Sequence, residues 1–351
     1  MAGDWLLYGA NGYTGALTAR MAVERGMRPI LAGRRAEAVH ALAGSLGLEA
    51  RVFGLENPDA VAAGLEGVKV VLHAAGPFLR TSQPMAKACL GARVHYLDIT
   101  GEAAVFEALA ARDSAAKAAG VMLLPGAGFD VVPSDCLAAH LARRLPTATH
   151  LALAFLGLGG VSRGTATTMA ENAGEGGLVR RDGRLTRVPA AWKTRHVDFG
   201  GGPLRPCMTI PWGDVATAFH STGIPNIEVY MAAPLALRAL ALLSRPFGGL
   251  LRSAAVQRFL KRRIDARPPG PTDEQRSRGR SFLWGEVTDG RGGRAVSRLT
   301  TPEGYTLTAL ASLAIVARVL AGHAPPGFQT PSRAYGPDFV LELPGVTRHD
   351  E

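Results

Sequence analysis

Aromatic residues are scarce in this sequence, at 6% of the chain, and lysine is scarcer still, with five positions: Lys69, Lys87, Lys117, Lys193 and Lys261. The formal net charge of +10 therefore comes from arginine, most of which is scattered through every segment. A nucleic-acid groove would instead gather basic residues on one face and interleave them with aromatic side chains. We therefore expect no nucleic-acid partner.

Cysteine and long apolar runs are also scarce. The three cysteines, Cys89, Cys136 and Cys207, are odd in number and far apart, so the sequence suggests neither a disulfide framework nor a metal site. No stretch reaches the roughly eighteen uninterrupted apolar residues that a membrane-spanning helix needs. Residues 1–8 lead directly into an expected strand without the basic segment of a secretory signal, so we expect a cytoplasmic protein.

Glycine, by contrast, is abundant, with 43 residues. Three glycines recur at intervals of three between an expected strand (5–8) and an expected helix (16–25), which is a variant of the dinucleotide-binding fingerprint. The first glycine makes a tight turn, the second lets the backbone reach a pyrophosphate, and the third lets helix and strand pack closely. The helix N-terminus then stabilises the phosphates. The predicted phosphate loop consists of Gly9, Asn11, Gly12, Tyr13, Thr14 and Gly15.

The residues after the second expected strand (29–32) indicate which nucleotide binds. An NAD-binding fold carries an acid about twenty residues after its glycine loop, to hold the ribose 2′-hydroxyl. Here Gly33 is followed by Arg34 and Arg35 instead. Arginine suits a 2′-phosphate, because its planar fork offers paired donors. The pattern favours NADP; the alternative is that both arginines only begin a solvated helix.

Alternating strands and helices predict an α/β fold, with a doubly wound Rossmann-type parallel sheet, over residues 1–147. The expected strands are 5–8, 29–32, 50–53, 69–75, 94–98 and 121–124, and the expected helices are 16–25, 36–46, 58–65, 85–90, 103–119 and 136–145. Two loops rich in glycine and proline, 76–78 and 125–135, follow strands at the edge where ligands of such folds bind.

The second half predicts an α+β domain with a mixed or antiparallel sheet over residues 148–303. Its expected features are strands at 150–158, 226–231, 282–287 and 295–299, a hairpin turn at 181–184, helices at 164–173 and 214–222, and a linker or mobile loop at 266–279. Such a sheet could serve as a substrate lid and a homodimer surface. An apolar helix at 307–320 is expected to return, with the tail to residue 351, to the nucleotide domain.

Several of these segments resemble the saccharopine dehydrogenase-like oxidoreductases. They are Gly9-Ala10-Asn11-Gly12-Tyr13-Thr14-Gly15, Gly33-Arg34, Ala75-Gly76-Pro77-Phe78, Tyr96-Leu97-Asp98-Ile99-Thr100-Gly101-Glu102, Gly128-Phe129-Asp130-Val131-Val132-Pro133-Ser134-Asp135, Ser162-Arg163-Gly164-Thr165, Gly304-Tyr305 and Thr308-Ala309. The resemblance implies that the glycine loop, Arg34 and the loop of Ala75, Gly76, Pro77 and Phe78 contact NADP. The family includes enzymes that form amines from amino-acid imines and enoyl reductases that act in trans on polyketide-type acyl chains. Asn11 replaces a threonine common in the family's loop.

A nicotinamide enzyme leaves hydride transfer to its cofactor, so the protein must orient the substrate and supply or remove one proton. The main candidates are Asp98, Glu102 and Asp130, which follow the fifth and sixth strands; Tyr96, Ser134 and Asp135 accompany them. The structural alternatives are that Asp130 and Asp135 cap the following helix, that Tyr96 is core, and that Glu102 favours a helix start. The second domain offers His196, His220 and Tyr230 as possible proton donors.

Two other enzyme classes are excluded. No tyrosine is followed four positions later by lysine, as the short-chain dehydrogenases require, and no Gly-x-Ser-x-Gly elbow marks a serine hydrolase. We therefore expect an NADP(H)-dependent oxidoreductase that reduces a polarised C=N or C=C bond of a small or acyl-type substrate. The alternative is an NADP(H)-binding sensor without turnover.

The one dense basic cluster lies at residues 252–267, after the apolar run 229–251. It consists of Arg252, Arg258, Lys261, Arg262, Arg263 and Arg267. A solvated helix face is the simplest explanation. A peripheral membrane or acyl-carrier contact through residues 229–267 is the alternative.

Overall fold

The computed structural model of this chain describes residues 2–157, 160–171, 174–234, 238–239, 241–242, 245 and 248–351. The chain forms two compact units. Unit 1 comprises residues 1–132 and 305–334, and unit 2 comprises residues 133–304 and 335–351. Within the described ranges, no helix is long and apolar enough to cross a membrane.

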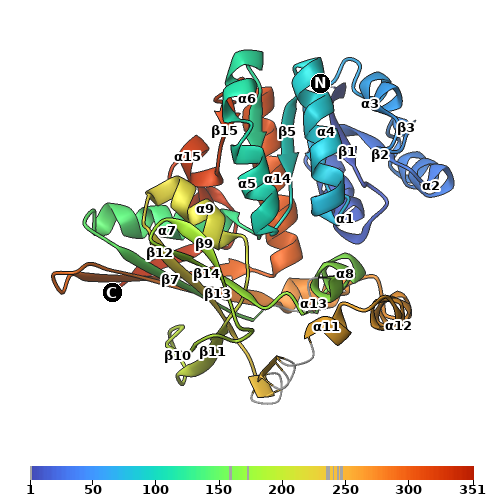
Figure 1. The fold of residues 1–351 in the computed structure, drawn as a ribbon. Coiled ribbons are helices and arrows are strands. Elements are labelled where there is room, and N and C mark those ends of the chain that lie inside the picture. The colour runs from blue at the N-terminus through green and yellow to red at the C-terminus, as the bar shows by residue number, and fades with distance from the viewer. Residues whose placement is uncertain are drawn as a thin grey trace. The chain divides into compact units, whose positions relative to one another are not determined.

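Unit 1 contains the predicted parallel sheet, which has seven strands within the described residues, in the order β15-β6-β5-β4-β1-β2-β3. The strands are β1 (Ala2–Tyr8), β2 (Arg28–Gly33), β3 (Ala50–Val52), β4 (Val70–His73), β5 (His95–Asp98), β6 (Met122–Leu124) and β15 (Gly327–Phe328). The helices are α1 (Tyr13–Glu24), α2 (Ala36–Leu46), α3 (Pro58–Gly64), α4 (Phe78–Ala92), α5 (Ala103–Ala110) and α6 (Asp113–Ala119). Contacts join α1 to α2 and α4 to α3, α5 and α6, and Figure 1 shows α4, α5 and α6 in front of the strands. The doubly wound fold class is therefore confirmed.

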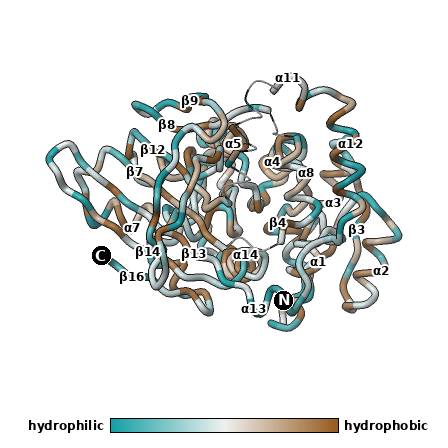
Figure 2. Tube along the Cα trace, turned by 90° about the horizontal axis from the view of Figure 1, so that it is seen from below, coloured by the Kyte–Doolittle hydropathy of each residue, from teal (hydrophilic) through white to brown (hydrophobic). Residues whose placement is uncertain are grey.

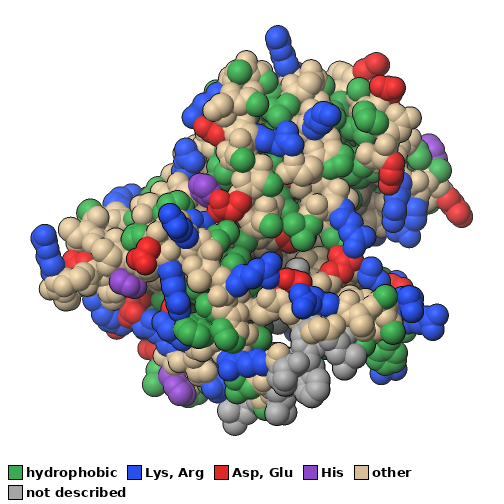
Figure 3. Space-filling model, in the orientation of Figure 1, with side chains coloured by type: hydrophobic (Ala, Val, Ile, Leu, Met, Phe, Trp, Pro, Cys, Tyr) green, Lys and Arg blue, Asp and Glu red, His purple; other side chains and the backbone are tan. Residues whose placement is uncertain are grey.

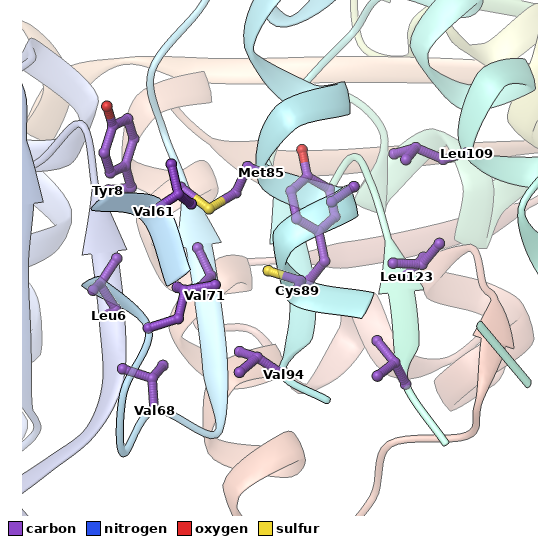
Figure 4. Close-up of a cluster of buried hydrophobic side chains, with 14 of the residues drawn as sticks. Leu6, Tyr8, Val61, Val68, Val71, Met85, Cys89, Val94, Leu109 and Leu123 are labelled. Carbon is purple, nitrogen blue, oxygen red and sulfur yellow. The ribbon is translucent and has the colours of Figure 1, made fainter. Parts of the chain in front are cut away.

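The core of unit 1 explains why the strands read as continuous apolar runs. Leu6, Val71 and Leu123 come from separate strands of the sheet and are fully buried, as are Met85 and Cys89 of α4, which pack in the same cluster (Figure 4). All three cysteines of the chain are buried and free. At about 25 cal/mol per Å² of apolar surface, such burial is the main stabilisation of this unit.

Two helix predictions in unit 1 are wrong in detail. Helix α4 begins at Phe78 and not at residue 85. Pro84 lies inside the helix, where it removes one helical hydrogen bond without ending the helix. The single helix expected at 103–119 is two helices, α5 and α6. Asp113 stands in the first turn of α6, where a negative charge favours a helix start, and its carboxylate accepts a hydrogen bond from the Phe328 N–H (2.9 Å).

Unit 2 contains the predicted mixed sheet, with nine strands in the described part of the chain. They are β7 (His150–Leu156), β8 (Gly177–Arg181), β9 (Arg184–Val188), β10 (Thr194–Val197), β11 (Arg205–Thr209), β12 (Asn226–Ala232), β13 (Arg280–Thr288), β14 (Arg294–Pro302) and β16 (Thr347–Asp350). Strands β7 and β12 are parallel, and the other pairs are antiparallel. The hairpin turn between β8 and β9 is where it was predicted.

Unit 2 also contains helices, some of which pack on its sheet. They are α7 (Val132–Arg144), α8 (Arg163–Glu171), α9 (Asp214–Thr222), α11 (Gly248–Leu251), α12 (Ala254–Asp265) and α13 (Asp273–Arg278). The last helices along the chain are α14 (Gly304–Leu320), α15 (Pro331–Tyr335) and the 3-10 helix η2 (Phe339–Glu342). Helix α7 packs on β13, where Gly285 leaves room for Leu137 and Leu141. Parts of the predicted elements 150–158, 164–173 and 229–267 lie outside the described residues.

Two further expectations for the second half need correction. The loop expected at 266–279 contains α13, because Thr272 and Gln275 form a capping box that starts a helix. The segment 304–351 does not return as a whole to unit 1. Helix α14, which Figure 2 shows in brown as an apolar helix, and β15 belong largely to unit 1, whereas β16 pairs with β14 in unit 2.

Candidate cofactor and active site

The glycine loop of unit 1 has the geometry of a phosphate cradle. Gly9 has a φ of +82°, and its N–H donates to the Ala32 carbonyl (2.8 Å). Gly12 is the N-cap of α1 and supplies no side-chain cap, and no acidic residue stands in the first turn. A Cβ on Gly15 would lie 2.3 Å from the Gly9 carbonyl oxygen. The helix start therefore approaches the strand closely and presents backbone N–H groups, which fits a pyrophosphate.

Arg34 and Arg35 are both exposed directly after β2. With the Asn11 amide turned so that its oxygen faces Arg35, this oxygen accepts from the Arg35 Nη2 (2.7 Å) and Nε (3.0 Å). The asparagine that departs from the family's loop therefore connects the phosphate loop to Arg35. Since Arg35 is the N-cap residue of α2, a helix does begin here, and Arg34 stands just before it.

We predict that Arg34→Ala will remove most of the preference for NADPH over NADH. Loss of a charge-assisted contact to the 2′-phosphate should weaken NADPH binding by roughly 1.5–3 kcal/mol and leave NADH binding unchanged. Calorimetric titration of both cofactors measures this, with Arg20→Ala on α1 as the control. Equal affinity of the wild type for both cofactors would contradict the prediction.

The loop after β4 is held in place by hydrogen bonds, including two to Glu102 in the loop after β5. Residues Ala75, Gly76 and Pro77 lead into α4, and Thr81 donates from its hydroxyl to the Ala75 carbonyl (2.7 Å). The Glu102 carboxylate accepts from the N–H groups of Phe78 (2.9 Å) and Leu79 (3.0 Å). A negative charge at this helix N-terminus is favourable. Glu102 therefore fastens the start of α4.

Removing this carboxylate should destabilise unit 1. Glu102→Ala leaves the two backbone donors of Phe78 and Leu79 without their acceptor, which we expect to cost roughly 1–3 kcal/mol of unfolding free energy. Denaturant unfolding compares this variant with Glu24→Ala, which removes a carboxylate from the exposed end of α1. Equal stability of the two variants would show that the Glu102 contacts contribute nothing.

Asp98 is fully buried at the end of β5 and ties two loops together. One carboxylate oxygen accepts from the N–H groups of Thr100 (2.9 Å) and Gly126 (3.0 Å), and the other accepts from the Tyr96 hydroxyl (2.7 Å). Burial raises the pKa of Asp98 to about 6, although these hydrogen bonds lower it. The side chain therefore joins the loop after β5 to the loop after β6.

Asp130 lies in the loop after β6 and has a different environment. Its carboxylate lies against Gly101, where a Cβ would come within 2.7 Å of an oxygen, and it accepts no hydrogen bond from any residue in the described ranges. Desolvation raises its pKa to about 6. Of the three acids, Asp130 alone has its carboxyl oxygens uncommitted within the described part of the chain.

Helix α14 supports this loop. The Phe129 N–H donates to the Thr308 hydroxyl (3.0 Å), and a Cβ on Gly128 would lie 2.8 Å from the Thr308 side chain. The ring of Tyr305 packs edge-on against Tyr13 of the phosphate loop, with centroids 5.0 Å apart. Tyr305 and Thr308 thus touch both loops of the site; the sequence indicated them only through the family resemblance.

The remaining candidates are core residues or lie in unit 2. Tyr96 is core, as its alternative stated. Ser221 donates to Asp135 in unit 2, His196 is exposed on β10, and the buried Tyr230 donates to Glu228. No group of histidine, cysteine and acidic side chains in the described ranges has the arrangement of a metal site.

Comparison with known proteins gives a domain family for residues 5–124 and a similar fold for the chain. Residues 5–124 match the model of the saccharopine dehydrogenase NADP-binding domain. A trans-acting enoyl reductase of Mycobacterium leprae is 33% identical over 150 residues, which are 40% of this chain and 36% of that protein. A putative trans-acting enoyl reductase of Mycobacterium tuberculosis is 34% identical over 140 residues, 38% of this chain and 33% of that protein. The matched region thus spans about a third of the length of these relatives.

Among solved structures, apo saccharopine dehydrogenase (L-Glu forming) from Saccharomyces cerevisiae has a similar fold. The TM-score is 0.68 at 12% sequence identity, and the match covers 100% of both chains. This similarity concerns the fold alone. The family model, over residues 5–124, confirms for that segment the resemblance inferred from the motifs and the expectation of NADP as cofactor.

Proposed function

We propose that this chain, whose residues 5–124 belong to the saccharopine dehydrogenase NADP-binding domain family, is an NADP-dependent reductase of the C=C bond of an enoyl thioester. The observation that carries the proposal is the 33–34% identity to trans-acting enoyl reductases. It favours C=C over C=N chemistry. The cradle of Gly9, Gly12 and Gly15 and the exposed Arg34 suit NADP(H), as argued from their geometry above.

In this proposal the residues of the chain bind NADPH, position the substrate and protonate it. Bound NADPH would supply a hydride to the β-carbon of the substrate. The C=C electron pair then moves toward the thioester carbonyl, and the α-carbon takes a proton. Asp130 is the proposed donor of this proton, because its carboxyl is not committed to a described partner and its raised pKa keeps part of it protonated near neutral pH.

The other two acids have positioning roles in this scheme. Asp98 holds the loops after β5 and β6 in register through Thr100 and Gly126, and Glu102 fixes the start of α4 beside the loop of Ala75, Gly76 and Pro77. Ala75, Gly76, Pro77 and Phe78 would then line the nicotinamide end of the cofactor, beyond the carboxyl ends of the central strands.

The test is NADPH oxidation with a 2-enoyl N-acetylcysteamine thioester and, separately, with a cyclic imine of an amino acid. Consumption of the thioester with saturation of its C=C bond, followed by mass spectrometry, supports the proposal. Turnover of the imine alone would overturn it in favour of C=N reduction. Tight NADPH binding without turnover of either substrate would favour the sensor that the sequence left open.

We further propose that the chain is a homodimer and that unit 2 contributes the interface. One face of the unit 2 sheet has a pocket of about 330 Å³ lined by charged residues, among them Arg195, Glu228 and Glu286. The pocket lies beside the buried cluster of Trp284, Tyr230 and Ala154. Light scattering after size-exclusion chromatography measures the mass. The cytoplasmic location expected from the sequence stays a prediction.

A further inference from the structure

Helix α12 of unit 2 presents a basic outer side. It carries four cations, Arg258, Lys261, Arg262 and Arg263, against the one acid Asp265. Lys261 pairs with Glu171 of α8 (3.0 Å). The three arginines are exposed and form no ion pair with any residue in the described ranges. This helix therefore holds three positive charges that the described part of the chain does not neutralise.

Large apolar side chains are exposed on the same helix and on its neighbour. Phe259 of α12 is 61% exposed, and Met169 of α8 is 57% exposed. Helices α8 and α12 are in contact, and Figure 3 shows basic and hydrophobic side chains next to one another at the place of α12 in Figure 1. Aromatic residues, methionine and arginine are the types enriched at protein interfaces, where lysine is depleted. We name Met169, Arg258, Phe259, Arg262 and Arg263 the α8–α12 surface.

The packing of α12 favours a protein over a membrane as the occupant of this surface. An amphipathic helix that lies on a bilayer inserts its apolar side between the lipids. Here the apolar side of α12 is already used: Ile264 and Leu260 pack against Ala166 and Ala170 of α8. What remains outside is arginine around one aromatic ring. That composition is complementary to an acidic protein surface with an apolar spot.

We propose that the α8–α12 surface docks an acidic carrier protein that presents the enoyl substrate as a thioester. The inference rests on the proposed function, because only a substrate held by a second protein needs such a surface. The arginines would attract the acidic carrier and set its orientation, and Phe259 would bury its ring in the contact. The substrate chain itself need not touch α12.

The experiment compares one enoyl chain in two forms, linked to N-acetylcysteamine and loaded on an acidic acyl carrier protein. Arg262→Glu/Arg263→Glu should raise KM for the carrier-bound form by roughly tenfold or more, through slower association, and leave the small thioester and both kcat values unchanged. Phe259→Ala should act in the same direction. The control is Arg20→Glu/Lys87→Glu, which changes the net charge equally on exposed helical positions of unit 1.

Three further outcomes test the docking proposal. An equal rise of KM in the control variant, or no rise in the α12 variant, overturns it. Binding to phosphatidylglycerol vesicles that depends on Arg262 and Arg263, with KM unchanged, would assign the surface to lipid. If the wild type reduces neither substrate, the proposed function fails. Calorimetric binding of the loaded carrier then tests the docking surface by itself: loss of binding in the α12 variant supports the proposal, and retention of binding overturns it.

Discussion

Replacing Asp130 by asparagine should lower kcat by about 10²–10⁴, with little change in NADPH affinity. The amide has nearly the shape of the carboxyl group but cannot release a proton to the α-carbon. Because the Asp130 carboxylate accepts no hydrogen bond from the described part of the chain, the change removes no hydrogen bond there. Burial disfavours the charged carboxylate, which is why the pKa of Asp130 is raised. A neutral amide avoids this cost, so the unfolding free energy at neutral pH should stay equal or rise.

The pH dependence gives this prediction a second readout. A proton donor must be protonated, and the pKa of Asp130 is raised to about 6, so kcat of the wild type should fall by about tenfold per pH unit well above that value. In Asp130→Asn this decline should disappear together with most of the activity. Stopped-flow measurement of NADPH oxidation from roughly one pH unit below to roughly three units above this pKa records both.

Asp98→Asn is the matched control, since Asp98 is a buried acid whose pKa is also raised to about 6. Its amide oxygen can still accept from the N–H groups of Thr100 and Gly126, and its NH₂ group can donate to the Tyr96 hydroxyl. We therefore expect kcat to change far less than in Asp130→Asn. If Asp98→Asn loses activity and Asp130→Asn keeps it, the assigned roles are reversed.

The nucleotide half was predictable from the sequence because local rules determine it. The φ of +82° at Gly9 and the close strand-helix approach at Gly15 require glycine at fixed spacing, and buried strands such as residues 70–73 require apolar runs. The sequence shows all of these patterns. Strand β15 left no such mark. It has two residues and joins the sheet only because the chain returns from unit 2 through α14.

The different hydrogen bonding of the three acids could not be predicted, because it depends on contacts between loops. Sequence position made Asp98, Glu102 and Asp130 equivalent, since all follow strands at the same edge of the sheet. The structure shows that two of them accept backbone N–H groups from other loops, at Phe78 and Gly126 among others, while the third accepts none in the described ranges. Hydrogen-bond partners therefore distinguish the two proposed positioning residues from the proposed proton donor, and the spacing of the three acids in the sequence does not reveal these partners.

Two glycine-to-alanine changes should have opposite effects, although both positions lie in helices. A Cβ at Gly15 would stand 2.3 Å from the Gly9 carbonyl oxygen and 2.8 Å from the Ala10 Cα, both of them backbone atoms that cannot rotate away. Helix α1 or the phosphate loop must then shift. We expect Gly15→Ala to lower the unfolding free energy by about 1–3 kcal/mol, the usual cost of overpacking.

The same shift should weaken cofactor binding, because the N–H groups at the start of α1 would no longer converge on the pyrophosphate. A rise of the NADPH dissociation constant by about tenfold or more corresponds to a loss of about 1.4 kcal/mol or more. At Gly91 in α4 a Cβ meets nothing within 4 Å, so Gly91→Ala should instead stabilise the protein by about 0.5–1 kcal/mol through helix propensity and leave NADPH binding unchanged. Chemical denaturation and calorimetric titration measure both variants. Equal behaviour of the two would show that the close approach at Gly15 is not what forms the phosphate site.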